Sequence, residues 1–275
     1  MITLIQGVPG SGKSAMMTAD MLDFLEFGGT IACNFDLVPG WSDKLAAADL
    51  KCKLGLRSKE QRSYDLWSRA YKIGSPDTIF ELSKVLTKKN KSGKMIEGQG
   101  RLYIDEAQLL FNSRQWQKNY GYIEFLTQHR KLGWDVYIVA HSDSMIDSQI
   151  RELFEIEARF RNLKKVKMFG LFPISMGALL FLAIFRYAGK SAGTGTIAYR
   201  RLYHLKKQYA DCYDSMEVFA FGDSKRSISH HGNSPNDKYQ NYELLSGMEN
   251  KGLSVRSDLP IPYSCAGWGS IRSMI

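Results

Sequence analysis

The chain has 275 residues, of which 44% are hydrophobic and 12% aromatic, so it is long and apolar enough to bury a substantial core. Its 37 basic and 28 acidic residues leave a net charge of +9, which suits nucleic acid, anionic lipid or an acidic partner without choosing among them. The four cysteines lie far apart and form no C-x-x-C pair. This spacing argues against a disulfide framework or a cysteine metal site, and it indicates a reduced, cytosolic chain.

The first informative stretch is Met1–Ser14, MITLIQGVPGSGKS. Its apolar start predicts a short buried strand, and residues 7–14 then match the Walker A pattern G-x-x-x-x-G-K-[ST] at every position. Glycines lack a Cβ, so the backbone N–H groups can turn inward around phosphate oxygens. A chance glycine-rich turn is the alternative, but the motif stands in the strand-loop-helix context that it requires. The predicted nucleotide-binding residues are Gly7, Val8, Pro9, Gly10, Ser11, Gly12, Lys13, Ser14 and Ala15.

The residues that end this loop have separate predicted roles. A helix that begins near Lys13 would add its positive N-terminal end, Lys13 would add a mobile charge, and the Ser14 hydroxyl would ligate Mg²⁺. ATP and Mg²⁺ are therefore the expected cofactors. Because the chain starts directly with the strand, it leaves no room for a signal peptide, and we expect the ATP site in the cytoplasm.

The rest of the pattern alternates strands and helices, which is typical of an α/β protein with a parallel sheet. Asn34 follows the second strand at the edge where such a sheet meets its ligand, although a plain turn explains it equally well. Between Pro39 and Tyr71 the weak pattern predicts peripheral helices and loops. The other predicted elements are helix 14–27, strand 30–34, helix 77–86, strand 102–104, helix 120–132, strand 135–140, short helix 144–153, and strand 154–161 with one wet face.

The second informative stretch is Arg101–Gln108, RLYIDEAQ, which has the form of a Walker B strand. Asp105 stands at the strand's end and Glu106 follows at once. In ATPases with this arrangement the aspartate holds Mg²⁺ through its water shell and the glutamate deprotonates the attacking water. A nucleoside kinase transfers the phosphate to its substrate and not to water, so it does not need a glutamate that activates water. The spacing from the phosphate loop also leaves room for an additional strand between the two motifs, so we predict a P-loop NTPase of the additional-strand, catalytic-glutamate type.

Two further features carry open alternatives. His141 stands at the end of the predicted strand 135–140, where it could sense the γ-phosphate or have a local structural role. The segment Lys84–Lys94 carries a run of lysines, which is either a solvated loop or a contact for nucleic acid.

Beyond the two nucleotide motifs, ordered segments along the chain make it resemble the filamentous-phage assembly ATPases, the family also named for zonular occludens toxin (Zot). The resemblance runs from Met1 to about Phe219. The segments that carry it are FNSRQW (Phe111–Trp116), HRKLGWD (His129–Asp135), SMIDSQIREL (Ser144–Leu153) and YDSMEVF (Tyr213–Phe219).

The resemblance implies a cytoplasmic ATPase domain at the host inner membrane, with a fold similar to that of hexameric DNA-pumping ATPases. Implied partners are further copies of the chain in a hexameric ring, the coat protein, the complex of genome and single-stranded-DNA-binding protein, and an outer-membrane secretin; contact with nucleic acid would be indirect. Arginines near a subunit interface would complete the neighbour's site. Arg130, ranked first, Arg114 and Arg151 occupy matching segments, though each could be an ordinary surface arginine. Family members often have glutamine where this chain has His141.

The predicted division is an ATPase core over residues 1–165, an apolar, β-rich appendage over 166–221, and a polar tail over 222–275 that wraps a core or stays disordered. Within the appendage, Met168–Phe185 contains no charged residue. As a helix it would extend about 27 Å against a hydrocarbon core of about 30 Å. Buried strands or a hydrophobic hairpin are favoured over a membrane-embedded segment. Family members usually continue through one membrane-spanning helix into a periplasmic domain, and the residues after Phe221 contain no such span.

The function predicted from the sequence is a Mg²⁺-dependent ATPase that powers filamentous phage assembly and export through the host inner membrane. A motor that translocates or packages DNA directly is the alternative, with Lys84–Lys94 lining a pore. A third hypothesis is a scaffold protein that uses ATP only to hold its ring together.

Overall fold

The structure is a computed structural model that describes residues 1–7, 10–73, 76–111, 116–162, 167–168, 172–173, 180–188, 195–204, 206–213 and 229–231. All of them belong to the unit Met1–Asn236, the first of two compact units into which the chain divides. The helices are α1 (Lys13–Glu26), α2 (Trp41–Ala48), α3 (Leu50–Lys53), α4 (Lys59–Ser68), α5 (Pro76–Val85), α6 (Ala107–Leu110), α7 (Trp116–Gln128), the 3-10 turn η2 (Asp143–Met145), α8 (Ser148–Arg151) and α9 (Lys207–Ala210). The strands are β1 (Ile2–Gln6), β2 (Thr30–Cys33), β3 (Ala70–Lys72), β4 (Gly100–Ile104), β5 (Trp134–Ala140), β6 (Ile156–Asn162), β7 (Lys167–Met168), β8 (Phe172–Pro173), β9 (Leu180–Tyr187), β10 (Ile197–His204) and β11 (Ser229–His230).

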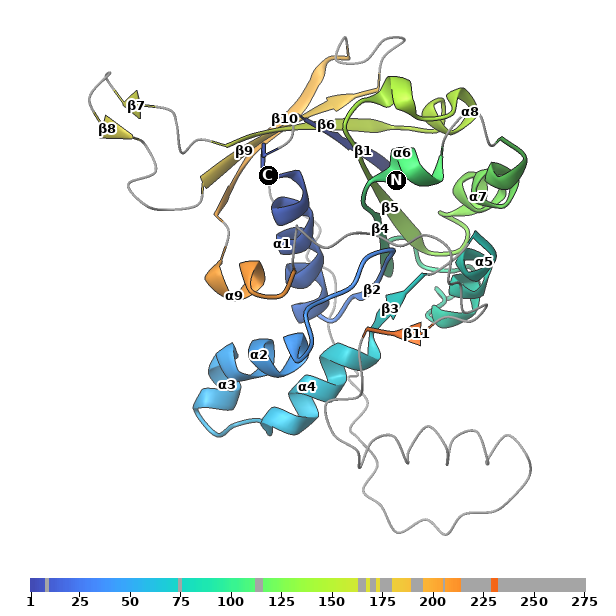
Figure 1. Cartoon of the computed structure of the whole chain (residues 1–275). Helices are drawn as coiled ribbons and strands as arrows, with labels where there is room; N and C mark the ends of the chain where they lie inside the picture. The colour runs from blue at the N-terminus through green and yellow to red at the C-terminus, as the bar shows by residue number, and fades with distance from the viewer. Residues whose placement is uncertain are drawn as a thin grey trace, which may run out of the picture. The chain divides into compact units, whose positions relative to one another are not determined.

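A nine-stranded sheet in the order β10-β9-β6-β1-β5-β4-β2-β3-β11 forms the centre of the unit (Figure 1). The strands from β6 to β3 in this order run parallel, whereas β9, β10 and β11 pair antiparallel at the two edges. β5 lies between β1, which precedes the Walker A loop, and β4, which precedes the Asp-Glu pair. This is the additional strand expected from the sequence, and it confirms the predicted fold class.

Helices cover both faces of the central strands because successive side chains on each strand point to opposite faces. α1 lies on one face, where Ile5 and Tyr103 join its core, and α5 and α7 lie on the other, where Leu4 and Leu102 join a second core (Figure 1). The weakly patterned region after Pro39 is predicted to be peripheral, but part of it belongs to the hydrophobic core. Its helices α2 and α4 bury large apolar residues in the first core: Trp41, Leu45, Leu66 and Trp67. These helices are too short for a periodic apolar face to stand out from the charges around it.

The uncharged stretch after Lys167 forms strands wherever it is described. β7 and β8 make a small antiparallel pair, and β9 joins the main sheet beside β6, with Phe181 and Phe185 buried. The strand alternative is therefore the correct one for these residues, and the rest of the stretch lies outside the described residues. Within the described ranges, no helix combines the length and apolar character needed to cross a bilayer.

Two local predictions need correction. The helix predicted over 144–153 is broken into η2 and α8, because the Asp147 side chain accepts a hydrogen bond from the Gln149 N–H and starts α8 afresh. The polar face predicted for strand 154–161 is not uniformly wet. Glu157 is only 6% exposed, and the register of β6 and β9 places it opposite Arg186, an oppositely charged neighbour.

Three described residues of the predicted polar tail are part of the folded unit. Ser229–His230 pairs with β3 at the sheet edge, and His231 is buried with its Nε2 2.9 Å from the carbonyl oxygen of Tyr71. This placement agrees with the wrapping alternative for these residues. Burial lowers the pKa of His231 to about 4.

His231 should make the protein sensitive to mild acid. Because its folded pKa of about 4 lies below the ordinary value of 6.5, the unfolded chain takes up a proton between these pH values that the folded chain does not. We expect the free energy of unfolding to fall as pH drops through this window, by up to about 3 kcal/mol. Urea unfolding of the wild type and of His231→Gln across this range measures the effect. A variant with the wild-type pH dependence would contradict the assignment.

Candidate nucleotide site

The loops after β1, β2, β4 and β5 meet at one edge of the sheet, because the carboxyl ends of parallel strands lie together. These loops begin at Gly7, Asn34, Asp105 and His141. Residues that are distant in the sequence therefore come together at this edge.

The Walker A loop has the backbone form that a phosphate cradle needs. Gly10 and Gly12 have φ values of +74° and +89°, which side chains disfavour. A Cβ on Gly7 would lie 2.7 Å from Ser11 Oγ, and one on Gly12 would overlap the ring of Phe181 from β9. Close packing therefore excludes a larger residue at Gly7 and Gly12, whereas at Gly10 the positive φ disfavours one. The predicted residues Val8 and Pro9 lie outside the described residues.

Lys13 is the first residue of α1 and is 7% exposed. Its Nζ donates a hydrogen bond to the carbonyl oxygen of Gly7 at 2.7 Å, so the side chain folds back across the loop. Burial lowers the pKa of the Lys13 ammonium, and the charges of Asp105 and Glu106 oppose that shift. The lysine and the predicted acidic pair therefore share one site.

Asp105 is 1% exposed, and hydrogen bonds fix both its backbone and its carboxylate. Asn34 Nδ2 donates to the Asp105 carbonyl oxygen at 2.9 Å, and the Asp105 N–H donates to Asn34 Oδ1 at 2.8 Å. Asp105 Oδ1 accepts from the Glu106 N–H at 2.9 Å, Oδ2 accepts from the Tyr213 hydroxyl at 3.1 Å, and the Ser14 hydroxyl bonds to the same carboxylate. Desolvation raises the pKa of Asp105, and the bonds from Ser14, Glu106 and Tyr213 counter that rise.

Glu106 is the only described residue other than glycine with a positive φ, at 49°. A non-glycine residue in this left-handed region costs of order 1–3 kcal/mol, and such strain is found mainly at functional sites. Glu106 Oε2 accepts a hydrogen bond from Gln108 Nε2 and lies 3.4 Å from His141 Nε2. The Glu106 side chain is 31% exposed, so water can reach the carboxylate that these two neighbours hold.

The donor set fits MgATP. A glycine-rich loop, a lysine at its end and a buried Ser11 Oγ that has no hydrogen-bond partner among the described residues suit the phosphates. The Ser14 hydroxyl and the Asp105 carboxylate offer the hard oxygen atoms that suit Mg²⁺ and its water shell. Around them, Glu106 and His141 provide groups that can accept or donate a proton.

The two predicted arginines that the structure describes, Arg130 and Arg151, are not part of this arrangement. Arg130 lies near the amino ends of the strands, the opposite edge of the sheet, where its Nη2 pairs with Glu155. Arg151 is exposed at the end of α8, and Arg114 lies outside the described residues. A role for Arg130 in catalysis would therefore require the site of a neighbouring copy.

Three residues at the site have no predicted role in the sequence analysis: Asn34, Gln108 and Tyr213. Asn34 is predicted only to follow the second strand at the ligand-facing edge of the sheet. Gln108 closes the RLYIDEAQ stretch, and Tyr213 opens YDSMEVF. For Gln108 and Tyr213, the sequence indicates only that they stand in motif segments. Their contacts with Glu106 and Asp105 are visible only in the structure.

Comparison with known proteins identifies relatives of this chain. A family model described as zonular occludens toxin (Zot) matches residues 1–178. The "Gene 1 protein" of Salmonella phage IKe is 25% identical over 241 residues, covering 83% of this chain and 59% of the relative, and the "Gene 1 protein" of Enterobacteria phage I2-2 gives the same values. The chain thus spans about three fifths of the length of these curated relatives.

Two solved structures are also similar. The N-terminal domain of zonular occludens toxin from Neisseria meningitidis matches with a TM-score of 0.43 and 16% identity, covering 78% of this chain and 98% of that domain. The ATPase domain of G40P matches with a TM-score of 0.44 and 10% identity, covering 77% of this chain and 83% of that domain. Because the family model covers more than half of the residues, the chain belongs to the zonular occludens toxin (Zot) family, and it has a P-loop ATPase fold.

Proposed function

We propose that this chain is a Mg²⁺-dependent ATPase that powers the assembly and export of a filamentous phage through the host inner membrane. The observation that carries the ATPase part is the placement of Glu106, held in a strained backbone beside His141 and close to the Walker A lysine. The likeness to the Gene 1 proteins of two phages supports a role in the phage cycle.

The proposed mechanism assigns one task to each group. The loop amides and Lys13 would bind the phosphates of ATP, and Ser14 with Asp105 would hold Mg²⁺, which would supply positive charge to the phosphate oxygens. Glu106 takes a proton from the attacking water as general base. His141, 3.4 Å from the Glu106 carboxylate, orients that base and senses the terminal phosphate.

We further propose that the working form is a homo-oligomeric, hexameric ring at the cytoplasmic face of the inner membrane. An arginine of the neighbouring copy would stabilise charge in the transition state, with Arg130, Arg114 and Arg151 as candidates. The ring would act on the coat protein as the complex of genome and single-stranded-DNA-binding protein is replaced, and would pass the virion to an outer-membrane secretin.

The test is ATP hydrolysis by the purified chain, measured with and without Mg²⁺, membrane vesicles carrying coat protein, and single- or double-stranded DNA. Stimulation by the coat protein vesicles supports an assembly engine. Absence of nucleotide binding and hydrolysis under every condition would contradict the proposed function.

The DNA translocation motor is kept as the second candidate because the basic run is accessible. Lys88, Lys89, Lys91 and Lys94 are all exposed, in a turn closed by a bridge between Lys89 and Met95. Stimulation by DNA and not by coat protein, lost when these lysines are replaced by Gln, would favour this motor. Very slow turnover in an assembly that still requires nucleotide would favour a scaffold.

A further inference from the structure

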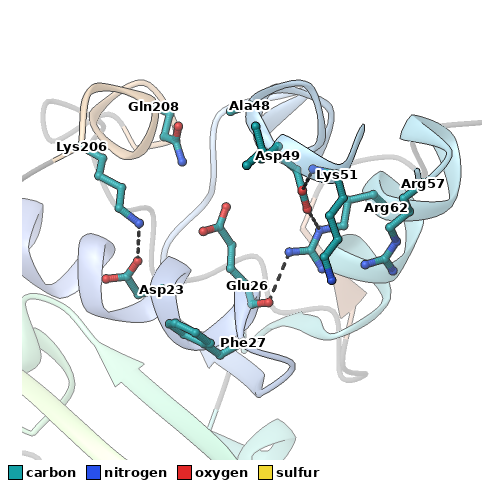
Figure 2. Close-up of a pocket in the computed structure, with 11 residues that line it drawn as sticks. Asp23, Glu26, Phe27, Ala48, Asp49, Lys51, Arg57, Arg62, Lys206 and Gln208 are labelled. Atoms are coloured by element: carbon teal, nitrogen blue, oxygen red, sulfur yellow. Dashed lines mark hydrogen bonds and ion pairs between the residues drawn. The ribbon is translucent and has the colours of Figure 1, made fainter. Parts of the chain in front are cut away.

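A segment that follows the last long strand of the sheet is fixed along α1, the helix that starts with the Walker A lysine. Lys206 Nζ donates to Asp23 Oδ1 at 2.9 Å, and the Tyr209 hydroxyl of α9 lies 2.6 Å from the same oxygen and 2.7 Å from Glu26 Oε2. Lys206 and Gln208 line a pocket of about 410 Å³ together with Asp23 and Glu26. Figure 2 shows Lys206 joined to Asp23 at one side of it. Charge and hydrogen bonding thus hold this end of the segment 206–213 in place.

The other end of the segment passes under the loop that follows β2. The Cys212 carbonyl oxygen accepts a hydrogen bond from the Val38 N–H at 3.0 Å, and the Cys212 side chain is buried. The rings of Tyr213 and Phe35 meet edge to face with centroids 4.9 Å apart. The Cys212 backbone bond and the contact with the Phe35 ring therefore position Tyr213 independently of its hydroxyl.

The Tyr213 hydroxyl donates to Asp105 Oδ2 at 3.1 Å, while Oδ1 accepts from the Glu106 N–H. Asn34 fixes the backbone of Asp105, so the tyrosine, together with the Glu106 N–H, restrains the rotation of the carboxylate. Ser14 bonds to that carboxylate from the Walker A side. Tyr213 thus reaches the Asp105 carboxylate, beside Ser14, from a segment that belongs to neither nucleotide motif.

We propose that Tyr213 is a positioning residue of the metal site: its hydroxyl orients the Asp105 carboxylate for Mg²⁺ held with Ser14, which makes the segment 206–213 part of that site. The inference rests on the proposed function and deepens it. Groups that hydrogen-bond to a metal-ligating carboxylate typically change metal affinity or activity by 10–100-fold when they are replaced. The binding of the metal thereby depends on whether this segment is docked.

The test is Tyr213→Phe, which removes the hydroxyl and keeps the ring that packs on Phe35. We would measure the affinity for a fluorescent, non-hydrolysable ATP analogue as a function of free Mg²⁺, and again in EDTA. The expected result is a half-saturating Mg²⁺ concentration about 10-fold higher than in the wild type, with unchanged affinity in EDTA. In steady-state hydrolysis, excess Mg²⁺ should recover much of the lost rate.

The matched control is Tyr187→Phe on β9, which makes the same chemical change at a 58% exposed side chain that pairs with Ile156, at the edge of the sheet opposite the site. It should keep the wild-type Mg²⁺ dependence. A Tyr213→Phe protein with the wild-type Mg²⁺ dependence, or an equal shift in Tyr187→Phe, would overturn the role assigned to the Tyr213 hydroxyl while leaving the ATPase proposal intact. If the unmodified chain binds no nucleotide with or without Mg²⁺, the proposed function fails and takes this inference with it.

Discussion

Glu106→Gln is expected to bind ATP with nearly wild-type affinity and to hydrolyse it about 10²–10⁴-fold more slowly. The amide has the size of the carboxylate and keeps an oxygen for the hydrogen bond from Gln108, but it cannot take a proton from water. The Walker A loop and Lys13 are untouched, so the phosphates are still held. Single-turnover hydrolysis, together with equilibrium binding of ATP to the same protein, measures both halves of this expectation.

Glu97→Gln is the matched control, because Glu97 is exposed in the loop before β4 and lies at the other edge of the sheet. Its turnover should equal that of the wild type. If Glu106→Gln hydrolyses ATP at the normal rate, Glu106 is not the base, and another group must prepare the water. His141 would be the first to examine, since its Nε2 lies 3.4 Å from the same carboxylate.

Lys13→Ala is expected to abolish measurable hydrolysis, with a loss of at least about 10²–10³-fold in rate, and to weaken ATP binding. Lys13 is the one cation of the Walker A motif, and its ammonium lies inside the loop against the Gly7 carbonyl oxygen. Alanine leaves the loop amides in place but removes the positive charge that stabilises the phosphate oxygens in the bound state and in the transition state. Nucleotide binding by titration calorimetry and steady-state hydrolysis provide the two measurements.

The control for Lys13→Ala is Lys59→Ala at the exposed first turn of α4, which should keep both properties. A melting temperature close to that of the wild type would show that Lys13→Ala is folded, since the lysine that it removes is buried at a desolvation cost. Tight ATP binding and normal turnover in Lys13→Ala would mean that the loop does not act as a phosphate site.

The sequence by itself determined the parts of this protein that depend on local chemistry. A complete Walker A pattern and an acidic pair after an apolar strand specify their chemistry in a few adjacent residues, and period-2 and period-3.6 patterns identify most of the central strands and long helices. The strand over 135–140 was recognisable in the same way, from its apolar run DVYIVA. These features need no knowledge of distant partners.

Only the tertiary structure decided which distant residues meet. Phe181 covers Gly12, Tyr213 reaches Asp105, His231 is buried at the far sheet edge, and the carboxylate of Glu106 lies beside His141. Each contact depends on the order of strands in the sheet and on loops that bring separated segments together. No local period encodes that order, because closing a long loop costs entropy that only the complete set of packed contacts repays.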